Sequence, residues 1–184
     1  MKESKEKRKF FWKGEQSISD ERIYGEIYAP IYGEYTNLRG KVADAYETVA
    51  FLEQICGGRN ALELGIGDGR VAVPLSERGI KVEGIDNSRA MLELVAKRSA
   101  LIKLWQEDIA NFRSDHRYRV VYCIYCTFML LSNREAQIAC LRAAEKVVDD
   151  EGVLVIEVDV PNWNPFVGGE RTTSAQLVGD DNAM

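Results

Sequence analysis

Three alternating glycines lie in the sequence ELGIGDG at residues 63–69, directly after a short apolar run and before a helical pattern. Glycine permits a tight turn and lets ligand atoms approach the backbone closely. A glycine-rich junction between a strand and a helix is the setting in which many proteins bind nucleotides. A simple strand-to-helix turn does not need three alternating glycines, so the pattern predicts a cofactor site.

An acidic residue, Asp86, ends the next apolar run, about twenty residues after the glycines. A carboxylate at the end of the neighbouring strand can accept hydrogen bonds from both ribose hydroxyls of an adenosine-bearing cofactor. The alternative is an acidic residue at a helix N-terminus that only offsets the helix dipole. The spacing from the glycines favours ribose binding.

Arg70 argues against a nicotinamide cofactor. A dinucleotide-binding loop reads Gly-x-Gly-x-x-Gly, and its third glycine would fall on this residue. An arginine side chain would crowd the close helix–strand packing that this glycine permits. A nicotinamide-dependent oxidoreductase is therefore the least favoured class of function.

Alternating strand and helix patterns must position these residues. Apolar residues at helical spacing and terminal glycines predict the helices, and Ser132 and Glu135 form a capping box that opens the last one. Tyrosines within 21–36 also follow a helical spacing. The expected helices are 41–56, 70–78, 88–98 and 132–148, and the expected strands are 61–64, 80–85, 100–105, 118–124 and 153–160, with a turn at 149–152.

Five strands that alternate with helices predict an open, doubly wound α/β sheet. The last run, VLVIEVDV at 153–160, is almost continuously apolar and β-branched, as in parallel strands that are covered on both faces. In such sheets, ligands bind in the crevice at the carboxyl ends of the strands. The glycines and Asp86 both lie at such ends.

The composition excludes several classes of protein. The 184 residues include 29 acidic and 24 basic residues, which give a net charge of −5, and 46% are hydrophobic. This length suits one domain, and the net charge gives no overall attraction to nucleic acid or to an anionic membrane. No apolar run reaches the roughly 18–20 residues that span a bilayer, and the basic start lacks the apolar segment of a secretion signal. We therefore expect a cytoplasmic protein.

Four cysteines and one histidine make a metal site unexpected. Cys123 and Cys126 lie in or just after a strand-like run, where residues three apart point to opposite faces, and a second pair of zinc ligands is missing. We expect buried thiols that act as small hydrophobic groups. His116 is expected in a solvated loop rather than as a general base.

The segment ALELGIGDGRVAVPLSERGIKVEGIDNSRAML, residues 61–92, resembles the motif I region of class I S-adenosylmethionine-dependent methyltransferases that act on small molecules. The resemblance runs from about Tyr24 to Asp159. RIYGEIYA at 22–29 is similar to the Tyr-Asp-x-x-Tyr segment of this family. WQEDIANF at 105–112 and VVYCIYCTFMLL at 120–131 are similar to two later motifs.

The resemblance implies a Rossmann-like sheet with the strand order 3-2-1-4-5, helices on both faces, and S-adenosyl-L-methionine as the cofactor. In the family pattern, Gly65 and Gly67 line the methionine moiety and Glu63 supports its amino end. The backbone carbonyl near Ile124 would also meet the amino group. Asp86 would hold the ribose.

The adenosine side of the cofactor is assigned on the same resemblance. Asn87 and Met91 would lie beside the adenosine, Asp108 would accept from the adenine amino group, and the Ile109 N–H would reach the ring. The residues expected at the cofactor are Tyr24, Glu63, Gly65, Ile66, Gly67, Asp86, Asn87, Met91, Asp108, Ile109 and Ile124.

The resemblance also implies methyl transfer to a nitrogen, oxygen or carbon atom of a small-molecule acceptor, by in-line displacement at the sulfonium. An acceptor hydroxyl usually needs a base, and the sequence does not choose among Glu157, Asp159 and Tyr125 for that role. No catalytic residue is therefore assigned. The second class of function is a non-catalytic S-adenosylmethionine-binding module that acts through a partner chain.

The chain is expected to divide into a mobile basic arm at 1–20, a cofactor-binding domain at 21–160 and a short tail at 161–184. Members of the family continue past the fifth strand with a helix and two further strands, for which this tail is too short. The run 153–160 would then be an exposed sheet edge, which natural proteins avoid. Truncation of the acceptor side is the favoured explanation; the others are a partner chain, such as a second copy paired through this edge, and the folding back of TTSAQLV at 172–178.

Overall fold

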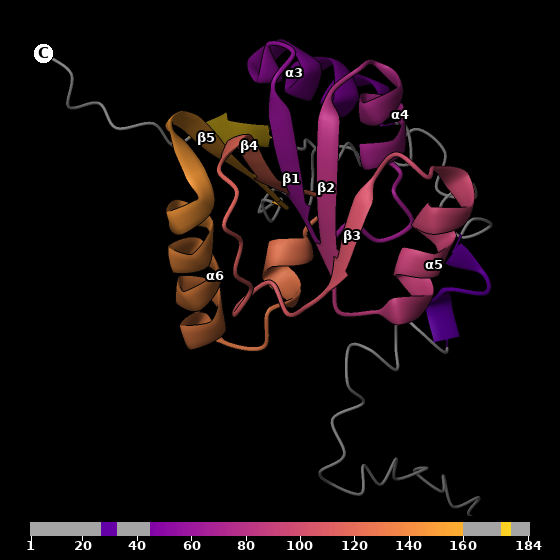
Figure 1. The fold of residues 1–184 in the computed structure, drawn as a ribbon. Coiled ribbons are helices and arrows are strands. Elements are labelled where there is room, and N and C mark those ends of the chain that lie inside the picture. The colour runs from indigo at the N-terminus through magenta and orange to yellow at the C-terminus, as the bar shows by residue number, and fades with distance from the viewer. Residues whose placement is uncertain (1–26, 33–44, 160–173, 178–184) are drawn as a thin grey trace, which may run out of the picture.

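The computed structural model describes residues 27–32, 45–159 and 174–177. These residues form a six-stranded sheet in the order β3-β2-β1-β4-β5-β6 (Figure 1). The first five strands pair in parallel, which confirms the predicted doubly wound sheet with the order 3-2-1-4-5. The strands are β1 (Asn60–Leu64), β2 (Lys81–Asp86), β3 (Lys103–Gln106), β4 (Tyr118–Cys123), β5 (Val148–Val158) and β6 (Ser174–Leu177).

The sixth strand, β6, is short and antiparallel. It pairs with Val155–Val158 of β5, so this part of the last parallel strand is not an open edge. The sequence left three explanations for the edge at 153–160, and the structure supports the folding back of the tail, since 174–177 of the segment expected to fold back pairs with β5. The predicted arm at 1–20 lies outside the described residues.

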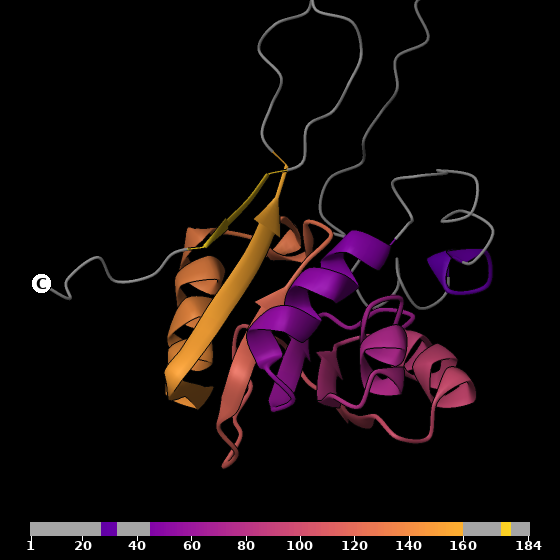
Figure 2. The same cartoon turned by 90° about the horizontal axis from the view of Figure 1, so that it is seen from above.

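Helices cover both faces of the sheet. The α-helices are α3 (Tyr46–Cys56), α4 (Ala72–Glu77), α5 (Arg89–Arg98) and α6 (Arg134–Val147), and a short 3-10 helix, η3 (Thr127–Leu130), follows β4. α3, α4 and α5 pack on one face and α6 on the other, as the view from above shows (Figure 2).

Local signals set the ends of most helices. α3 ends at Gly57, which adopts the left-handed conformation with φ +56°, as expected of a C-terminal glycine. The side chain of Ser88 caps α5. The predicted Ser132–Glu135 capping box is wrong by one residue, because Asn133 is the cap and its side-chain oxygen accepts the Ala136 N–H at 2.8 Å. Asparagine is as good an N-cap as serine.

Two strands begin more than two residues away from their predicted start. β3 begins at Lys103, later than expected. The predicted turn at 149–152 lies inside β5, where the pairing with β4 shifts register after Val148 pairs with Tyr118, and the ladder resumes at Val153. The segment therefore keeps a turn-like irregularity inside one strand, as a bulge does.

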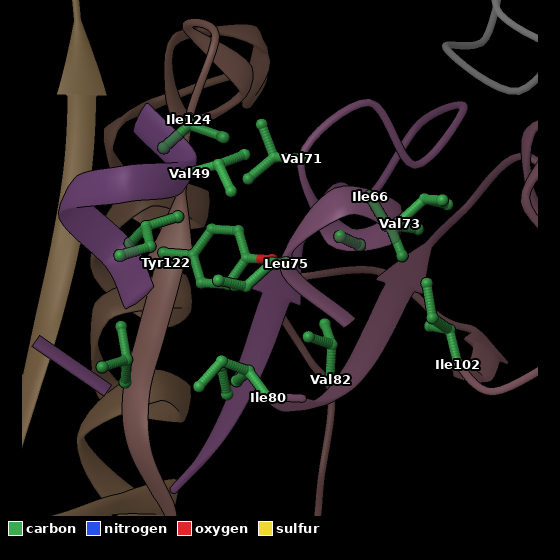
Figure 3. Close-up of a cluster of buried hydrophobic side chains, with 14 of the residues drawn as sticks. Val49, Ile66, Val71, Val73, Leu75, Ile80, Val82, Ile102, Tyr122 and Ile124 are labelled. Atoms are coloured by element: carbon green, nitrogen blue, oxygen red, sulfur yellow. The ribbon is translucent and has the colours of Figure 1, made fainter. Parts of the chain in front are cut away.

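Buried apolar residues fill both faces of the central strands. Figure 3 shows the cluster on the face of α3, α4 and α5, with Tyr122 at its centre. A second cluster packs under α6. β1, β2 and β4 thus have both faces covered. The apolar run 153–160 predicted the same for β5, but β5 lies nearer the sheet edge and is mostly half-buried, with Val155 its one buried residue. Three cysteine thiols, Cys56, Cys123 and Cys140, are buried as predicted, and Cys126 is half-buried.

Within the ranges that the structure describes, no group of three or more His, Cys, Asp and Glu side chains is arranged to hold a metal ion. None of the helices in those ranges combines the length and the apolar character needed to cross a membrane.

Candidate cofactor site

A cavity of about 210 Å³ lies at the carboxyl ends of β1, β2 and β4. The glycine turn after β1 forms one wall, and the segments after β2, β3 and β4 form the others. Every predicted cofactor residue within the described part of the chain lines this cavity, whereas Tyr24 lies outside that part. The residues brought together are Glu63, Gly65, Ile66, Gly67, Asp86, Asn87, Met91, Asp108, Ile109 and Ile124.

The three glycines of the turn have positive φ angles, +75° at Gly65, +55° at Gly67 and +76° at Gly69. A Cβ on Gly65 would overlap the methyl group of Thr127. A Cβ on Gly69 would lie 3.0–3.2 Å from valine side chains of α4 and α5, but one on Gly67 would meet no atom within 4 Å. Gly65 and Gly69 therefore permit close packing, and Gly67 leaves space open at the cavity.

Asp86 joins the glycine turn to the start of α5. One carboxylate oxygen accepts the Gly67 N–H at 2.8 Å, and the other accepts the Ser88 N–H at 2.8 Å. Burial raises the pKa of Asp86, while the N–H groups of Ser88, Gly67 and Asn87 act in the opposite direction. The carboxylate therefore supports the helix start and also lies in the cavity wall, where ribose binding stays a prediction. Each oxygen can accept a further hydrogen bond.

Glu63 is a buried acid, only 3% exposed, that lies on β1 and reaches the cavity. The Tyr122 hydroxyl donates to its Oε2 at 3.1 Å. Burial raises the pKa of Glu63 well above its ordinary value, whereas the Tyr122 hydrogen bond and the Arg70 charge act in the opposite direction. An arriving cation would favour the ionised form of this carboxyl group.

Arg70 lines the cavity, a role that the sequence patterns did not assign to it. Its guanidinium carbon lies 4.2 Å from the ring centroid of Tyr125 and 5.6 Å from that of Tyr32. Nη2 donates to the Tyr32 hydroxyl at 2.9 Å, and Nε lies 4.0 Å from a carboxylate oxygen of Asp68. Its position directly after the glycine run at the end of β1 could have indicated that Arg70 lies at the cavity. The comparison with the dinucleotide pattern considered Arg70 only as a side chain that would crowd the helix–strand packing. In the structure Gly69 permits this close packing instead.

On the β3 side of the cavity, the loop after β3 supplies Asp108 and Ile109. Asp108 accepts the Ala110 N–H at 2.8 Å and keeps its side chain exposed. Ile109 is buried. The side chain of Gln106 donates to the Asn87 carbonyl at 3.2 Å, which joins the segments that follow β2 and β3.

The three candidate bases, Tyr125, Glu157 and Asp159, lie in different environments. Tyr125 lines the cavity, and Glu157 accepts the Tyr125 N–H at 3.3 Å. Asp159 follows β5 and is exposed. His116 is exposed in the loop before β4, as predicted, with Nδ1 3.4 Å from a carboxylate oxygen of Glu83. That loop lies at the amino end of β4, away from the cavity.

The side chains around the cavity fit S-adenosylmethionine. Asp86 offers acceptors for ribose hydroxyls. Arg70 offers a guanidinium, the best partner for a carboxylate, and Glu63 offers an anion for an ammonium group. The apolar side chains of Ile66 and Ile109 suit a flat, largely apolar ring.

Known proteins with similar sequences are methyltransferases. The family model described as a methyltransferase domain matches residues 61–152, which is half of the chain. A curated relative, the cypemycin N-terminal methyltransferase from a Streptomyces species, is 25% identical over 166 residues. That match covers 89% of this chain and 67% of the relative.

Solved structures agree with the predicted fold. The CcbJ methyltransferase from Streptomyces caelestis is 30% identical with a TM-score of 0.71, and the match covers 77% of this chain and 59% of that one. CalS10 from Micromonospora echinaspora, an amino pentose methyltransferase solved with S-adenosylmethionine bound, is 24% identical with a TM-score of 0.63, and the match covers 73% of this chain and 57% of that one. The chain thus spans less than two thirds of the length of these two proteins. With the family model, the fold and the cavity in agreement, the chain belongs to the methyltransferase domain family, as its resemblance predicted.

Proposed function

We propose that this chain binds S-adenosyl-L-methionine in the cavity and transfers its methyl group to an amine nitrogen of a small-molecule acceptor. The observation that carries the proposal is the meeting of Glu63, Arg70 and Asp86 around one cavity at the carboxyl ends of the central strands. The family membership supports methyl transfer. The choice of nitrogen is supported by the curated relative, which is named as an N-terminal methyltransferase.

When bound, the cofactor supplies a methyl group that its positive sulfur already activates, so the protein adds position and electrostatics. Arg70 would pair with the carboxylate of the methionine moiety, Glu63 with its ammonium group, and Asp86 with the ribose hydroxyls. The Ile124 carbonyl accepts the Thr127 N–H at 3.2 Å. Its second lone pair would therefore be the one that meets the amino group.

We also propose a range for the cofactor-binding domain and a compartment for the chain. Residues 21–160 would form the cofactor-binding domain. The free cysteines Cys56, Cys123, Cys126 and Cys140 support a reducing compartment, and hence the cytoplasm. A dimer through the edge of β5 is not part of the proposal, because β6 already pairs with Val155–Val158.

Calorimetric titration of the chain with S-adenosylmethionine, S-adenosylhomocysteine and NAD tests the cofactor. We expect the first two to bind and NAD not to bind. Asp86→Ala should weaken binding at least tenfold, because hydrogen bonds to a charged group are lost. Glu93→Ala is the matched control, since Glu93 is an exposed acid on α5 that pairs with Arg89. Binding of NAD alone would contradict the proposal.

Methyl transfer is then tested with radiolabelled S-adenosylmethionine and a panel of small primary and secondary amines, with matched alcohols for comparison. Transfer to amines is the expected result. Transfer to alcohols alone would contradict the nitrogen acceptor. Tight cofactor binding without transfer to any acceptor would support the alternative, a binding module that acts through a partner chain.

A further inference from the structure

Two consecutive residues after β4 adopt a backbone conformation that L-residues disfavour. Tyr125 has φ +52° and Cys126 has φ +60°, and no other non-glycine residue in the described part of the chain has a positive φ. Neither residue is asparagine or aspartate, the types that enter this left-handed region most readily. Such residues persist only where surrounding contacts hold them, and they cluster at functional sites.

Contacts from both sides hold this turn. Glu157, near the end of β5, accepts the Tyr125 N–H through Oε2 at 3.3 Å. Asp159 interacts with the Cys126 thiol, and its charge raises the pKa of that thiol after the larger effect of burial. From the opposite side, the methyl group of Thr127 packs on the glycine turn after β1. The turn is thus held between β5 and that glycine turn.

The turn builds one wall of the cavity. It places Tyr125 in the cavity lining, with the guanidinium of Arg70 4.2 Å from the ring centroid. Glu157 is supported in turn by the ladder between β5 and β6, in which it lies opposite Ala175. A series of contacts therefore runs from β6 through Glu157 and Tyr125 to Arg70.

We propose that Glu157 is a positioning residue for methyl transfer, which holds the Tyr125 backbone and thereby fixes the aromatic ring that packs on Arg70. This role rests on the proposed function, since the wall serves catalysis only if the cofactor binds beside it. The sequence left Glu157 among three candidate bases. Its hydrogen bond to a backbone N–H instead assigns it to orienting the cavity wall.

The first test compares the binding of S-adenosylhomocysteine to the wild-type chain, Glu157→Ala and Glu157→Gln by calorimetry. Glu157→Ala should bind roughly tenfold more weakly, because a hydrogen bond to a charged group is lost and the wall relaxes. Glu157→Gln should restore most of the affinity, because an amide oxygen also accepts an N–H. Glu151→Ala is the control, an acid on the same strand with an 84% exposed side chain.

The second test follows the Tyr125 amide signal by NMR. The signal should move in Glu157→Gln, because a neutral amide oxygen is a weaker acceptor than a carboxylate. It should stay in place in Asp159→Asn, which separates the two neighbouring acids. This readout does not depend on whether Glu157→Ala folds.

The outcomes distinguish this proposal from the proposed function. A folded Glu157→Ala chain with wild-type affinity, or a Tyr125 amide signal that does not move in Glu157→Gln, overturns the positioning role. A wild-type chain that binds no S-adenosylhomocysteine overturns the proposed function. In that case the Tyr125 amide signal still decides whether Glu157 holds the turn.

Discussion

The methyl group of Thr127 occupies the place where a side chain on Gly65 would begin. The two residues belong to different turns, one after β4 and one after β1, and both line the cavity. Glycine at position 65 is therefore required by the protein's own packing, independently of any ligand. Gly67 differs, because the space beside it is open.

Gly65→Ala should destabilise the fold by about 2–4 kcal/mol, because the new Cβ adds overpacking to the cost of a left-handed alanine. Thermal or denaturant unfolding measures this loss. Adding Thr127→Ser removes the overlapping methyl group and should recover about 1 kcal/mol or more. Equal stability of the single and double variants would show that the contact does not matter.

Gly67→Ala should reduce cofactor affinity more than it reduces stability. With no atom within 4 Å of its Cβ, the variant should lose only about 1 kcal/mol of stability, from the left-handed backbone. Its affinity for S-adenosylhomocysteine should fall at least tenfold, since the methyl group enters the cavity space that the glycine leaves open. Calorimetry and unfolding on the same sample separate the two effects. Wild-type affinity in this variant would place the cofactor elsewhere.

Glu63→Gln should change how stability depends on pH. Because burial raises the pKa of Glu63 in the folded chain, the folded state holds this proton more tightly than the unfolded state does. The free energy of unfolding should therefore fall as the pH rises from the ordinary glutamate pKa to the raised one, by about 1.4 kcal/mol per pH unit at most. The variant should lose most of this decline, and Asp86, whose pKa burial also raises, should account for the remainder. Identical pH profiles would mean that Glu63 is ionised in the folded chain.

Arg70→Met should weaken S-adenosylhomocysteine binding by about 10- to 100-fold, because a charge-assisted pair with the carboxylate is lost. Arg70→Lys should give an intermediate affinity, since it keeps the charge but not the planar group that stacks on Tyr125. Arg78→Met is the matched control. Its guanidinium also lies over a tyrosine ring, 5.5 Å from the centroid of Tyr46, but it pairs with Glu53 and does not line the cavity. A larger loss in the Arg78 variant would contradict the assignment.

Much of the fold followed from the sequence because its central strands, β1, β2 and β4, are buried on both faces. Their apolar runs and the glycines between them are local signals, so the strands and the meeting of the glycine turn with Asp86 could be predicted, whereas the strand order came from the family resemblance. The start of α6 could not be placed as well, because serine and asparagine stand side by side at 132 and 133 and either can cap a helix. Tertiary pairing with β4 drew the polar residues 149–152 into a strand, and no local pattern carries that information.

The site was predictable where a residue type and a strand end coincided. Asp86 is of this kind, because it ends β2, whereas Glu63 was expected at the cofactor only through the family resemblance. Arg70 was missed because its role depends on two distant rings, Tyr32 and Tyr125, which only the fold brings to it. The contact between Glu157 and the Tyr125 N–H was also hidden, because it joins a side chain to a backbone group that the sequence does not reveal.

The pairing of β6 with only Val155–Val158 has a consequence for aggregation. Among the described residues, the other half of β5 carries three consecutive acids, Asp149, Asp150 and Glu151, and Asp150 and Glu151 are exposed. Two copies that approached one another along this half would bring these charged side chains together, with the arginines Arg59 and Arg117 that pair with Asp149 and Asp150. The charge thus discourages sheet-to-sheet growth near neutral pH.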